Sequence, residues 1–452
     1  MHHTTCVILA AGKGKRMKSD LPKVMHTLAG QPMIDHVLDK VEALGITEVF
    51  TVLGHGKDLL LQHLNQRSQV VYQEEQLGTG HALMQAVPHL KEESCVLVLS
   101  GDQPLLSVET LKALLETHKK SECAATVLTA QMVDPTGYGR IVRKDGVFCQ
   151  IVEEKDAKPE QKIIKEINTG TYCFQAEALK KGLQSIKPQN AQGEYYLTDI
   201  FKILISSGKK IATFCTDDYR EALGINNRLQ LAEAENLIYE SIKEYWMLEG
   251  VTIVNPSSVL IDTQVEIEKD VIIQPFTILK GRTKIGKGSV IGPGTRLENC
   301  TCLAGVQIEN SVAKEAVIGE NCVIGPYAYL RPGTVLAEGV KVGDFVEVKN
   351  SVIGEGSKVP HLSYIGDSTL GKNVNIGAGT ITCNYDGRKK HSTVIGDGAF
   401  VGSNTNFVAP VEIGKQAVIG AGSTITGNVP DNSLAVERSK QRIINNWRKA
   451  NN

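Results

Sequence analysis

A glycine-rich, basic loop follows the first apolar run of the sequence. It carries Gly12 and Gly14, then Arg16, and Lys23 comes shortly after. Glycines allow backbone N–H groups to approach a phosphate closely, and the two basic side chains supply positive charge. The loop is not a Rossmann dinucleotide fingerprint, because Met17 stands where a third glycine is needed, and it is not a Walker A motif. The pattern predicts a polyphosphate-binding loop; a basic surface turn is the alternative.

A carboxylate follows a later apolar run. Gly101 and Asp102 come directly after Cys95–Leu99, which has the composition of a buried strand. Open α/β sheets bind ligands at the carboxyl ends of their strands. On its own, an aspartate in this place is more often a turn or cap residue than a metal ligand, so the prediction of a site depends on the residues around it.

The combination GxGxRM followed by PK resembles the sugar-nucleotide pyrophosphorylases. The resemblance implies that UTP is a substrate, that Arg16 and Lys23 are catalytic, and that Asp102 and Asn226 hold Mg²⁺. It also implies a larger set of contacts to the nucleotide and the sugar. These residues are Leu9, Ala10, Ala11, Gly12, Gly14, Lys23, Gln73, Gly78, Thr79, Ser100, Gly101, Asp102, Gly139, Glu153, Asn168 and Asn226.

The chemistry of such a reaction needs few protein groups. An oxygen of a sugar-1-phosphate attacks the α-phosphorus of UTP and displaces pyrophosphate, and no general base is required because this nucleophile is already an anion. The protein must hold two polyanions in line and neutralise their charge. Mg²⁺ prefers few protein oxygens together with phosphates and water, which agrees with a two-residue ligand set. Lys15 and Ser100 depart from the family pattern, where threonine and tyrosine are frequent, and this affects only fine substrate preference.

A six-residue repeat begins after Val251. An aliphatic residue followed by glycine recurs at this spacing, for example at Ile285-Gly286 and Ile291-Gly292. A helix period would drift across such a repeat, whereas a coil of short strands returns the aliphatic side chain to the interior. We expect the glycines to relieve the backbone at the turns. The repeat predicts a parallel β-helix. It resembles the hexapeptide-repeat acyltransferases, which implies a left-handed coil and a homotrimer.

Several polar residues lie near successive coils of this repeat, around His361. Their pattern is similar to the glucosamine-1-phosphate acetyltransferase domain of a bifunctional enzyme family that makes UDP-N-acetylglucosamine, a precursor of peptidoglycan and lipopolysaccharide. The resemblance implies that His361 is the general base, because a neutral imidazole can accept the amine proton at neutral pH. Glu347 is a possible orienter of His361. The sugar phosphate would be bound by Arg331, Lys349, Tyr364 and Asn375, and acetyl-CoA by Ala378, Asn384, Tyr385, Ser403, Ala421 and Arg438.

The order of patterns along the chain gives the expected domains. Residues 1–228 alternate strand-like and helix-like runs, which favours a Rossmann-like α/β sheet covered on both faces, with an antiparallel hairpin at Arg140–Glu153 around Asp145-Gly146. Residues 229–249 read as a helical linker and 250–452 as the left-handed β-helix. The expected fold class is therefore α/β, with a nucleotidyltransferase domain, a long helix and a parallel β-helix.

Composition limits the kinds of partner. The net charge is −1, from 49 basic and 50 acidic residues, which argues against bulk binding to nucleic acid or to an anionic membrane. The first apolar run is too short for a secretion signal or a membrane span. The ten cysteines form no CxxC pair, so reduced thiols and a cytoplasmic location are expected.

Two other functions fit parts of the sequence. A pyrophosphorylase for another sugar-1-phosphate, with a β-helix that only oligomerises, would lack the catalytic histidine and the basic residues near it. A non-catalytic scaffold would have a degraded phosphate loop. The presence of His361, Arg331 and Lys349 weighs against the first alternative, and that of Arg16 and Lys23 against the second.

Overall fold

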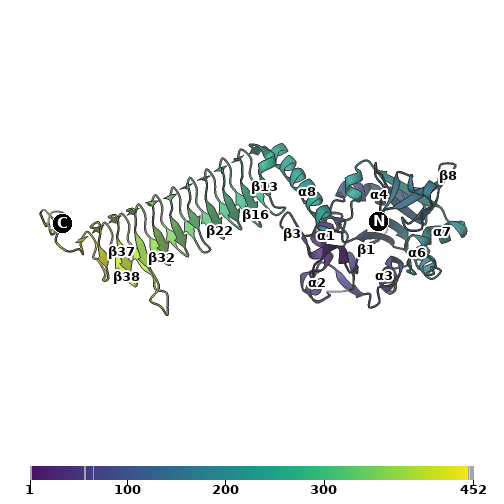
Figure 1. Cartoon of the computed structure of the whole chain (residues 1–452), viewed down its shortest axis with the longest axis horizontal. Helices are drawn as coiled ribbons and strands as arrows, with labels where there is room; N and C mark the ends of the chain where they lie inside the picture. The colour runs from purple at the N-terminus through teal and green to yellow at the C-terminus, as the bar shows by residue number, and fades with distance from the viewer. Residues whose placement is uncertain (1–2, 55–56, 65, 446, 448–452) are drawn as a thin grey trace. The chain divides into compact units, whose positions relative to one another are not determined.

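The computed structural model describes residues 3–54, 57–64, 66–445 and 447. It divides into two compact units, Met1–Ile238 and Tyr239–Asn452. The first is a sheet with helices around it, and the second is a stack of short-stranded coils (Figure 1).

A mixed sheet forms the centre of the first unit. Its main path runs in the order β11-β7-β10-β6-β1-β4-β5. The strands are β1 (Thr4–Ala10), β4 (Glu48–Leu53), β5 (Gln69–Tyr72), β6 (Cys95–Ser100), β7 (Ala125–Gln131), β10 (Glu166–Gln175) and β11 (Ile211–Thr216). The expected parallel order holds for β6-β1-β4-β5.

One central strand differs from the sequence-based expectation. β10 pairs antiparallel with both β6 and β7. It follows the hairpin of β8 (Gly139–Lys144) and β9 (Val147–Val152), whose turn is the predicted Asp145-Gly146. β8 also pairs antiparallel with β10. The chain returns to the sheet from this hairpin through residues 153–165, which contain the four-residue helix α5 (Pro159–Lys162).

Helices cover both faces of the sheet. They are α1 (Met33–Ala43), α2 (Lys57–Leu64), α3 (Thr79–Ala86), α4 (Val108–Ser121), α6 (Ala176–Leu183) and α7 (Asp199–Ser206). Successive side chains of β1 enter different cores, Val7 on one face and Cys6 and Ile8 on the other. A strand that is buried on both faces reads as a continuous apolar run, which explains the sequence of β1.

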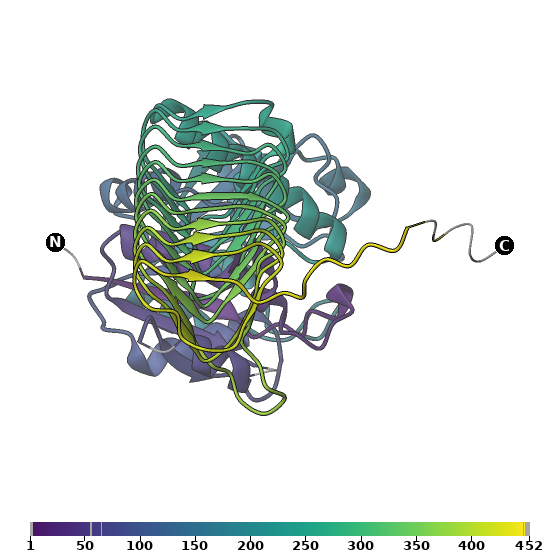
Figure 2. The same ribbon diagram turned by 90° about the vertical axis from the view of Figure 1, so that its left-hand side faces the viewer.

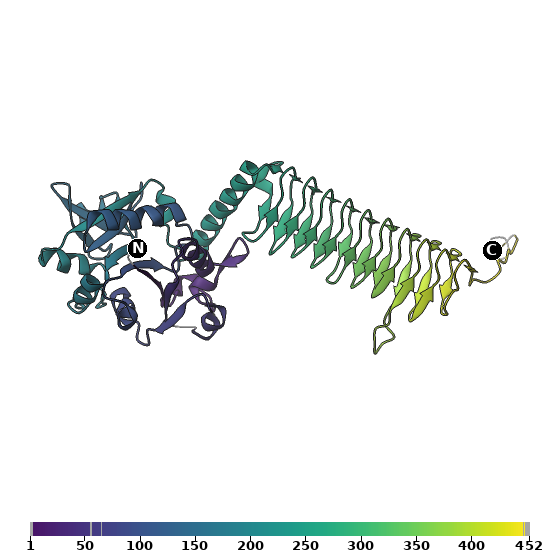
Figure 3. The same ribbon diagram turned by 180° about the vertical axis from the view of Figure 1, so that it is seen from behind.

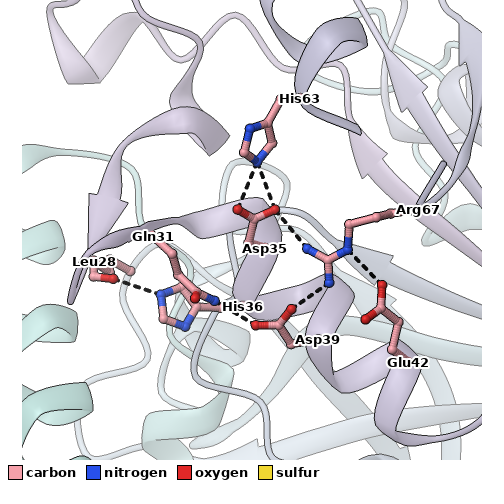
Figure 4. Close-up of polar contacts among 8 residues, drawn as sticks. All are labelled: Leu28, Gln31, Asp35, His36, Asp39, Glu42, His63 and Arg67. Carbon is pink, nitrogen blue, oxygen red and sulfur yellow. Dashed lines mark hydrogen bonds and ion pairs between the residues drawn. The ribbon is translucent and has the colours of Figure 1, made fainter. Parts of the chain in front are cut away.

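Polar contacts fix α1 against the chain around α2 (Figure 4). Asp35, Asp39 and Glu42 lie on one face of α1, and each accepts a hydrogen bond from the Arg67 guanidinium, at 3.1, 2.5 and 2.7 Å. His63 of α2 contacts Asp35 at 2.8 Å. This network holds α1, the helix that follows the phosphate loop in the chain and precedes β4.

The helix α8 (Arg228–Leu248) spans the boundary between the two units. Asn227 caps it by accepting a hydrogen bond from the backbone N–H of Gln230 at 2.9 Å. In the first unit, Ala234 is buried in a small cluster with Leu28 and Met33. In the second unit, Ile242 and Trp246 pack against the core of the coils.

The second unit is a parallel β-helix (Figures 2 and 3). Strands of two to four residues, from β12 (Thr252–Ile253) to β41 (Leu434–Ala435), form three ladders of eleven, ten and nine parallel strands. One aliphatic core runs through the whole stack. The loop between β34 (Ile381–Cys383) and β35 (Thr393–Ile395) interrupts the repeat and projects from the coils (Figure 2).

The glycines of the repeat have two roles, and one of them is the expected one. Gly286 and Gly319 do not have positive φ, but a Cβ at either position would lie 2.6 Å from backbone carbon of the next coil, at Leu303 and Ala337 respectively. These glycines therefore permit the close approach of stacked coils. Gly292 and Gly325, with φ of 106° and 105°, are the ones that relieve the turn.

Candidate functional site

The phosphate loop lies beside a cavity at the carboxyl ends of the first unit's parallel strands. The cavity has a volume of about 530 Å³. Ten residues of the predicted nucleotide site line it: Leu9, Ala10, Ala11, Gly12, Lys23, Gln73, Gly78, Thr79, Ser100 and Asp102. Lys13, Lys15 and Glu194 also line it and lie outside the predicted set.

Two glycines shape the wall of this cavity. Gly14 has φ of 58°, and a Cβ there would lie 2.8 Å from the Cβ of Lys23. Gly78 has φ of 111°, and a Cβ there would lie 2.7 Å from the carbonyl oxygen of Tyr195. Each glycine therefore brings its loop against a second segment of the wall, which only a residue without a side chain allows.

Oxygens of Asp102 and Asn226 converge on one ammonium group. Lys23 Nζ donates hydrogen bonds to Asp102 Oδ2 and, at 3.1 Å, to Asn226 Oδ1. Arg16 Nη2 also donates to Asn226 Oδ1, at 2.9 Å. The four residues that the sequence singles out for charge and metal binding thus form one cluster, although Asn226 lies 203 residues from Lys23 in the chain.

The donor set of this cluster fits a Mg²⁺ ion. A carboxylate and an amide oxygen are hard ligands that point at a common centre, and Mg²⁺ completes its shell with water and phosphate oxygens. Among the described residues there is no group of three or more His, Cys, Asp or Glu able to hold a metal. Two protein oxygens would leave most of the shell of a Mg²⁺ ion to phosphate and water.

The residues predicted to bind the sugar form a second group, away from the cavity lining. Gly139 lies against Glu153 and Asn168, since a Cβ at position 139 would be 3.4 Å from atoms of both. Glu153 accepts a hydrogen bond from Thr198 Oγ1 at 2.9 Å, and burial raises its pKa. Asn168 donates to Tyr172 Oη at 2.8 Å. Gly101, which belongs to the predicted nucleotide site, lies in the chain between Ser100 and Asp102, two residues that line the cavity.

One polar atom in the cavity wall has no partner within the protein. Gln76 Oε1 is buried and makes no hydrogen bond in the described structure, and Gln76 lines the cavity. Nearby, Gln73 donates to the carbonyl oxygen of Gly78 at 3.0 Å. A buried acceptor without a partner is costly unless a ligand satisfies it, so this wall is suited to a ligand with hydrogen-bond donors.

In the second unit, the predicted acetyl-transfer residues lie on adjacent coils. Lys349 is on β28 (Glu347–Lys349), Tyr364 on β31 (Tyr364–Gly366), and Arg331 follows β25 (Tyr329–Leu330), and these three strands are neighbours in one ladder. His361 ends β30 (Lys358–His361) and Asn375 begins β33 (Asn375–Ile376), which are neighbours in another ladder. A single corner of the coil, between β30 and β31, joins the two groups.

His361 has a carboxylate partner that the sequence did not reveal. Its Nδ1 lies 2.6 Å from Asp344 Oδ1, and this contact lowers the pKa of Asp344. The expectation that Glu347 orients His361 is wrong in this structure, because Glu347 accepts a hydrogen bond from Arg331 Nη1 at 2.7 Å. Asp344 and His361 are 17 residues apart and lie on adjacent coils. Their contact can be recognised only once the register of the coils is known.

A second lysine completes the basic group. Lys390, in the loop that interrupts the repeat, lies beside Lys349, and the neighbouring positive charge lowers its pKa. Two adjacent ammonium groups form a site for a doubly charged anion. Sequence reasoning missed Lys390, and its place in the interrupting loop was the available signal.

The residues predicted to bind acetyl-CoA lie on the last coils. Asn384 is buried and contacts Asp367 and, at 3.4 Å, Tyr364 Oη, while Tyr385 is exposed. Ala378 and Ser403 each accept a backbone hydrogen bond from the following coil, at Asn404 and Gly422. Arg438 Nη1 donates to the carbonyl oxygen of Ala421 at 2.8 Å. These residues therefore extend the predicted site from the coil that carries His361 towards the C-terminal coils.

Comparisons with known proteins divide the chain in the same order. A model of MobA-like NTP transferase domains matches residues 6–166, a model of GMPPB C-terminal domains matches 255–348, and a model of bacterial transferase hexapeptide repeats matches 392–427. The confirmed architecture is thus a nucleotidyltransferase domain followed by a left-handed hexapeptide β-helix. For the described residues, no helix is both long and apolar enough to span a membrane.

Curated relatives match over nearly the whole chain. The chain is 59% identical over 447 residues to the bifunctional protein GlmU of Desulfitobacterium hafniense, covering 99% of each chain. It is 56% identical over 449 residues to the GlmU of Heliobacterium modesticaldum, covering 99% of this chain and 98% of the relative. It is 48% identical over 437 residues to the GlmU of a Geobacillus strain, covering 96% and 95%. On these findings, the chain belongs to the GlmU family of bifunctional proteins.

Proposed function

We propose that this chain acetylates glucosamine-1-phosphate with acetyl-CoA and then transfers UMP from UTP to the product, which releases pyrophosphate and forms UDP-N-acetylglucosamine. The observation that carries the proposal is that each unit of a GlmU-family chain holds its own charged constellation, one around Lys23 and one around His361. The product is a precursor of peptidoglycan and lipopolysaccharide.

In uridylyl transfer, the chain acts by position and charge. Arg16 and Lys23, which meet at the Asn226 amide oxygen, supply positive charge for the polyphosphate, and the backbone N–H groups of the glycine-rich loop accompany them. The oxygens of Asp102 and Asn226 would hold Mg²⁺, which supplies positive charge for the phosphates. Gln73 and Gln76 line the wall for the base, and Glu153 and Asn168 supply polar groups for the sugar hydroxyls. The attacking phosphate oxygen is an anion, so no group has to remove a proton.

In acetyl transfer, the amine of the sugar must lose a proton as it attacks the thioester. His361 Nε2 accepts that proton, since its Nδ1 is occupied by Asp344. The sugar phosphate is held by Arg331 and Lys349, with Lys390 beside them. Ala378, Ser403, Ala421 and Arg438 line the path of the acetyl-CoA along the coils.

The assembly that we propose is a cytoplasmic homotrimer. Several large apolar side chains are exposed at one corner of neighbouring coils, among them Tyr327, Phe345 and Leu362. The rings of Tyr327 and Phe345 stack with their centroids 5.5 Å apart. Exposed apolar side chains in a contiguous row are typical of an interface, and the row is next to His361, so the acetyl-transfer site lies at the contact between copies.

One coupled assay tests the proposed function. Glucosamine-1-phosphate, acetyl-CoA, UTP and Mg²⁺ are supplied, and the release of CoA and of pyrophosphate is followed separately. We expect both, with pyrophosphate release depending on the earlier release of CoA. Removal of the metal with EDTA should stop pyrophosphate release and leave CoA release intact. Pyrophosphate release at the full rate in metal-free buffer would contradict the role of Asp102 and Asn226.

A further inference from the structure

The stacking of the coils places a carboxylate on the imidazole of the acetyl-transfer site. β27 (Lys341–Asp344) and β30 are parallel neighbours, and Asp344 is the register partner of His361. Asp344 Oδ1 lies 2.6 Å from His361 Nδ1. A carboxylate accepts and does not donate, so Nδ1 carries the proton and the lone pair of the neutral ring is on Nε2.

The surroundings leave Asp344 as the charged partner of His361. On the neighbouring ladder, Glu347 is paired with Arg331 at 2.7 Å. On the coil that follows, β33 carries Asn375, which is uncharged. Tyr364, at the start of β31, is the next titratable side chain after the corner. Contact with His361 is the leading cause that lowers the pKa of Asp344, so this carboxylate is ionised at neutral pH.

We propose that Asp344 is a positioning residue for acetyl transfer: it holds His361 in the tautomer that can accept a proton at Nε2 and stabilises the imidazolium that results. The proposal rests on the proposed acetyltransferase function. The amine nitrogen forms a bond to the acetyl carbonyl carbon, the carbon–sulfur bond breaks, CoA leaves as the thiolate, and the amine proton passes to Nε2. The imidazolium then returns the proton to the thiolate or to water.

A merely structural ion pair between coils is the competing explanation. Lys372 and Glu355 form such a pair at 2.8 Å, also 17 residues apart, on the same β-helix. Both carboxylates link adjacent coils at an exposed position. Glu355→Gln is therefore a matched control for Asp344→Asn, because each change replaces a carboxylate by an amide of the same shape.

The test compares kcat and KM for acetyl transfer by full-length variants. For Asp344→Ala we expect kcat to fall roughly 10- to 100-fold, the usual scale for losing an orienting partner, with little change in KM for glucosamine-1-phosphate. For Asp344→Asn, which loses the charge but keeps an oxygen that can accept a hydrogen bond from Nδ1, we expect a smaller fall in kcat. Glu355→Gln should retain the wild-type kcat and KM.

A double-mutant cycle separates positioning from stability. In a His361→Ala background, Asp344→Asn should have no further effect on kcat, because the group through which it acts is gone. Additive losses, or a wild-type kcat for Asp344→Ala, would overturn the proposal. Thermal unfolding followed by circular dichroism checks that the β-helix of each variant is folded, because pyrophosphate release reports only on the first unit. Absence of CoA release by the wild type would contradict the proposed function, whereas an active wild type with unchanged Asp344 variants contradicts only this inference.

Discussion

The charged groups of the phosphate site meet at one point. Lys23 contacts both Asp102 and Asn226, and Arg16 reaches the same amide oxygen. The loop glycine Gly14 packs directly on Lys23. Because transfer between two polyanions is catalysed mainly by neutralising charge, these two basic side chains are the ones on which the rate should depend most.

Removal of either basic residue should therefore slow uridylyl transfer strongly. We expect Arg16→Ala and Lys23→Ala to lower kcat for pyrophosphate release by roughly 100- to 1,000-fold, the usual cost of one group that stabilises transition-state charge. Acetyl transfer should be unchanged, since its residues belong to the other unit. Lys112→Ala is a control, because Lys112 is exposed on α4 and outside the cavity lining. Loss of both activities in a folded Lys23→Ala protein would show that the sites are not separate.

The effect of removing the His361 imidazole should likewise be limited to acetyl transfer. We expect His361→Ala to lower CoA release roughly 100- to 10,000-fold, the range for losing a general base. Pyrophosphate release from supplied N-acetylglucosamine-1-phosphate should persist and serves as the internal control. Retention of most CoA release would mean that His361 is an exposed corner residue without a role in the reaction.

At the scale of elements, the features that can be predicted from the sequence are those encoded by short-range patterns. The hairpin turn at Asp145-Gly146 and the six-residue repeat both appear where expected. The antiparallel strand β10 was missed, because a buried strand has the same composition in either direction. Asp344 was missed for a related reason: its partner is one coil away, and only the register of the stack reveals the contact.

The repeat glycines offer a test at this scale. A Cβ at Gly319 would lie 2.6 Å from backbone carbon of Ala337, so Gly319→Ala should force adjacent coils apart. We expect a loss of about 1–3 kcal/mol in the stability of the second unit, the typical cost of overpacking. Gly427→Ala is the matched control, since no atom lies within 4 Å of the Cβ position there and φ is not positive. Thermal unfolding followed by circular dichroism compares the two, and equal midpoints would contradict the packing explanation.

At the scale of the whole molecule, each unit has its own core. The sheet of the first unit encloses two apolar clusters, and a single cluster fills the coils of the second. Contacts in a β-helix are made between neighbouring coils, so its stability does not depend on a distant sheet. The helix α8 contributes to both units, with Ala234 buried in the first and Trp246 packed in the second.

The two halves should therefore be separable, with assembly belonging to the second. We expect residues 1–228 to be monomeric and active in uridylyl transfer, and residues 250–452 to fold, form trimers and release CoA. Fragments cut at the boundary of the units, 1–238 and 239–452, are the matched controls. They should unfold at higher temperature than the shorter pair, because they keep the buried Ala234 and the packed Trp246 respectively. Light scattering gives the size of each fragment, and the two assays give its activity. A monomeric C-terminal fragment with full acetyl transfer would refute a site at the contact between copies, and a folded but inactive N-terminal fragment would refute the independence of the halves.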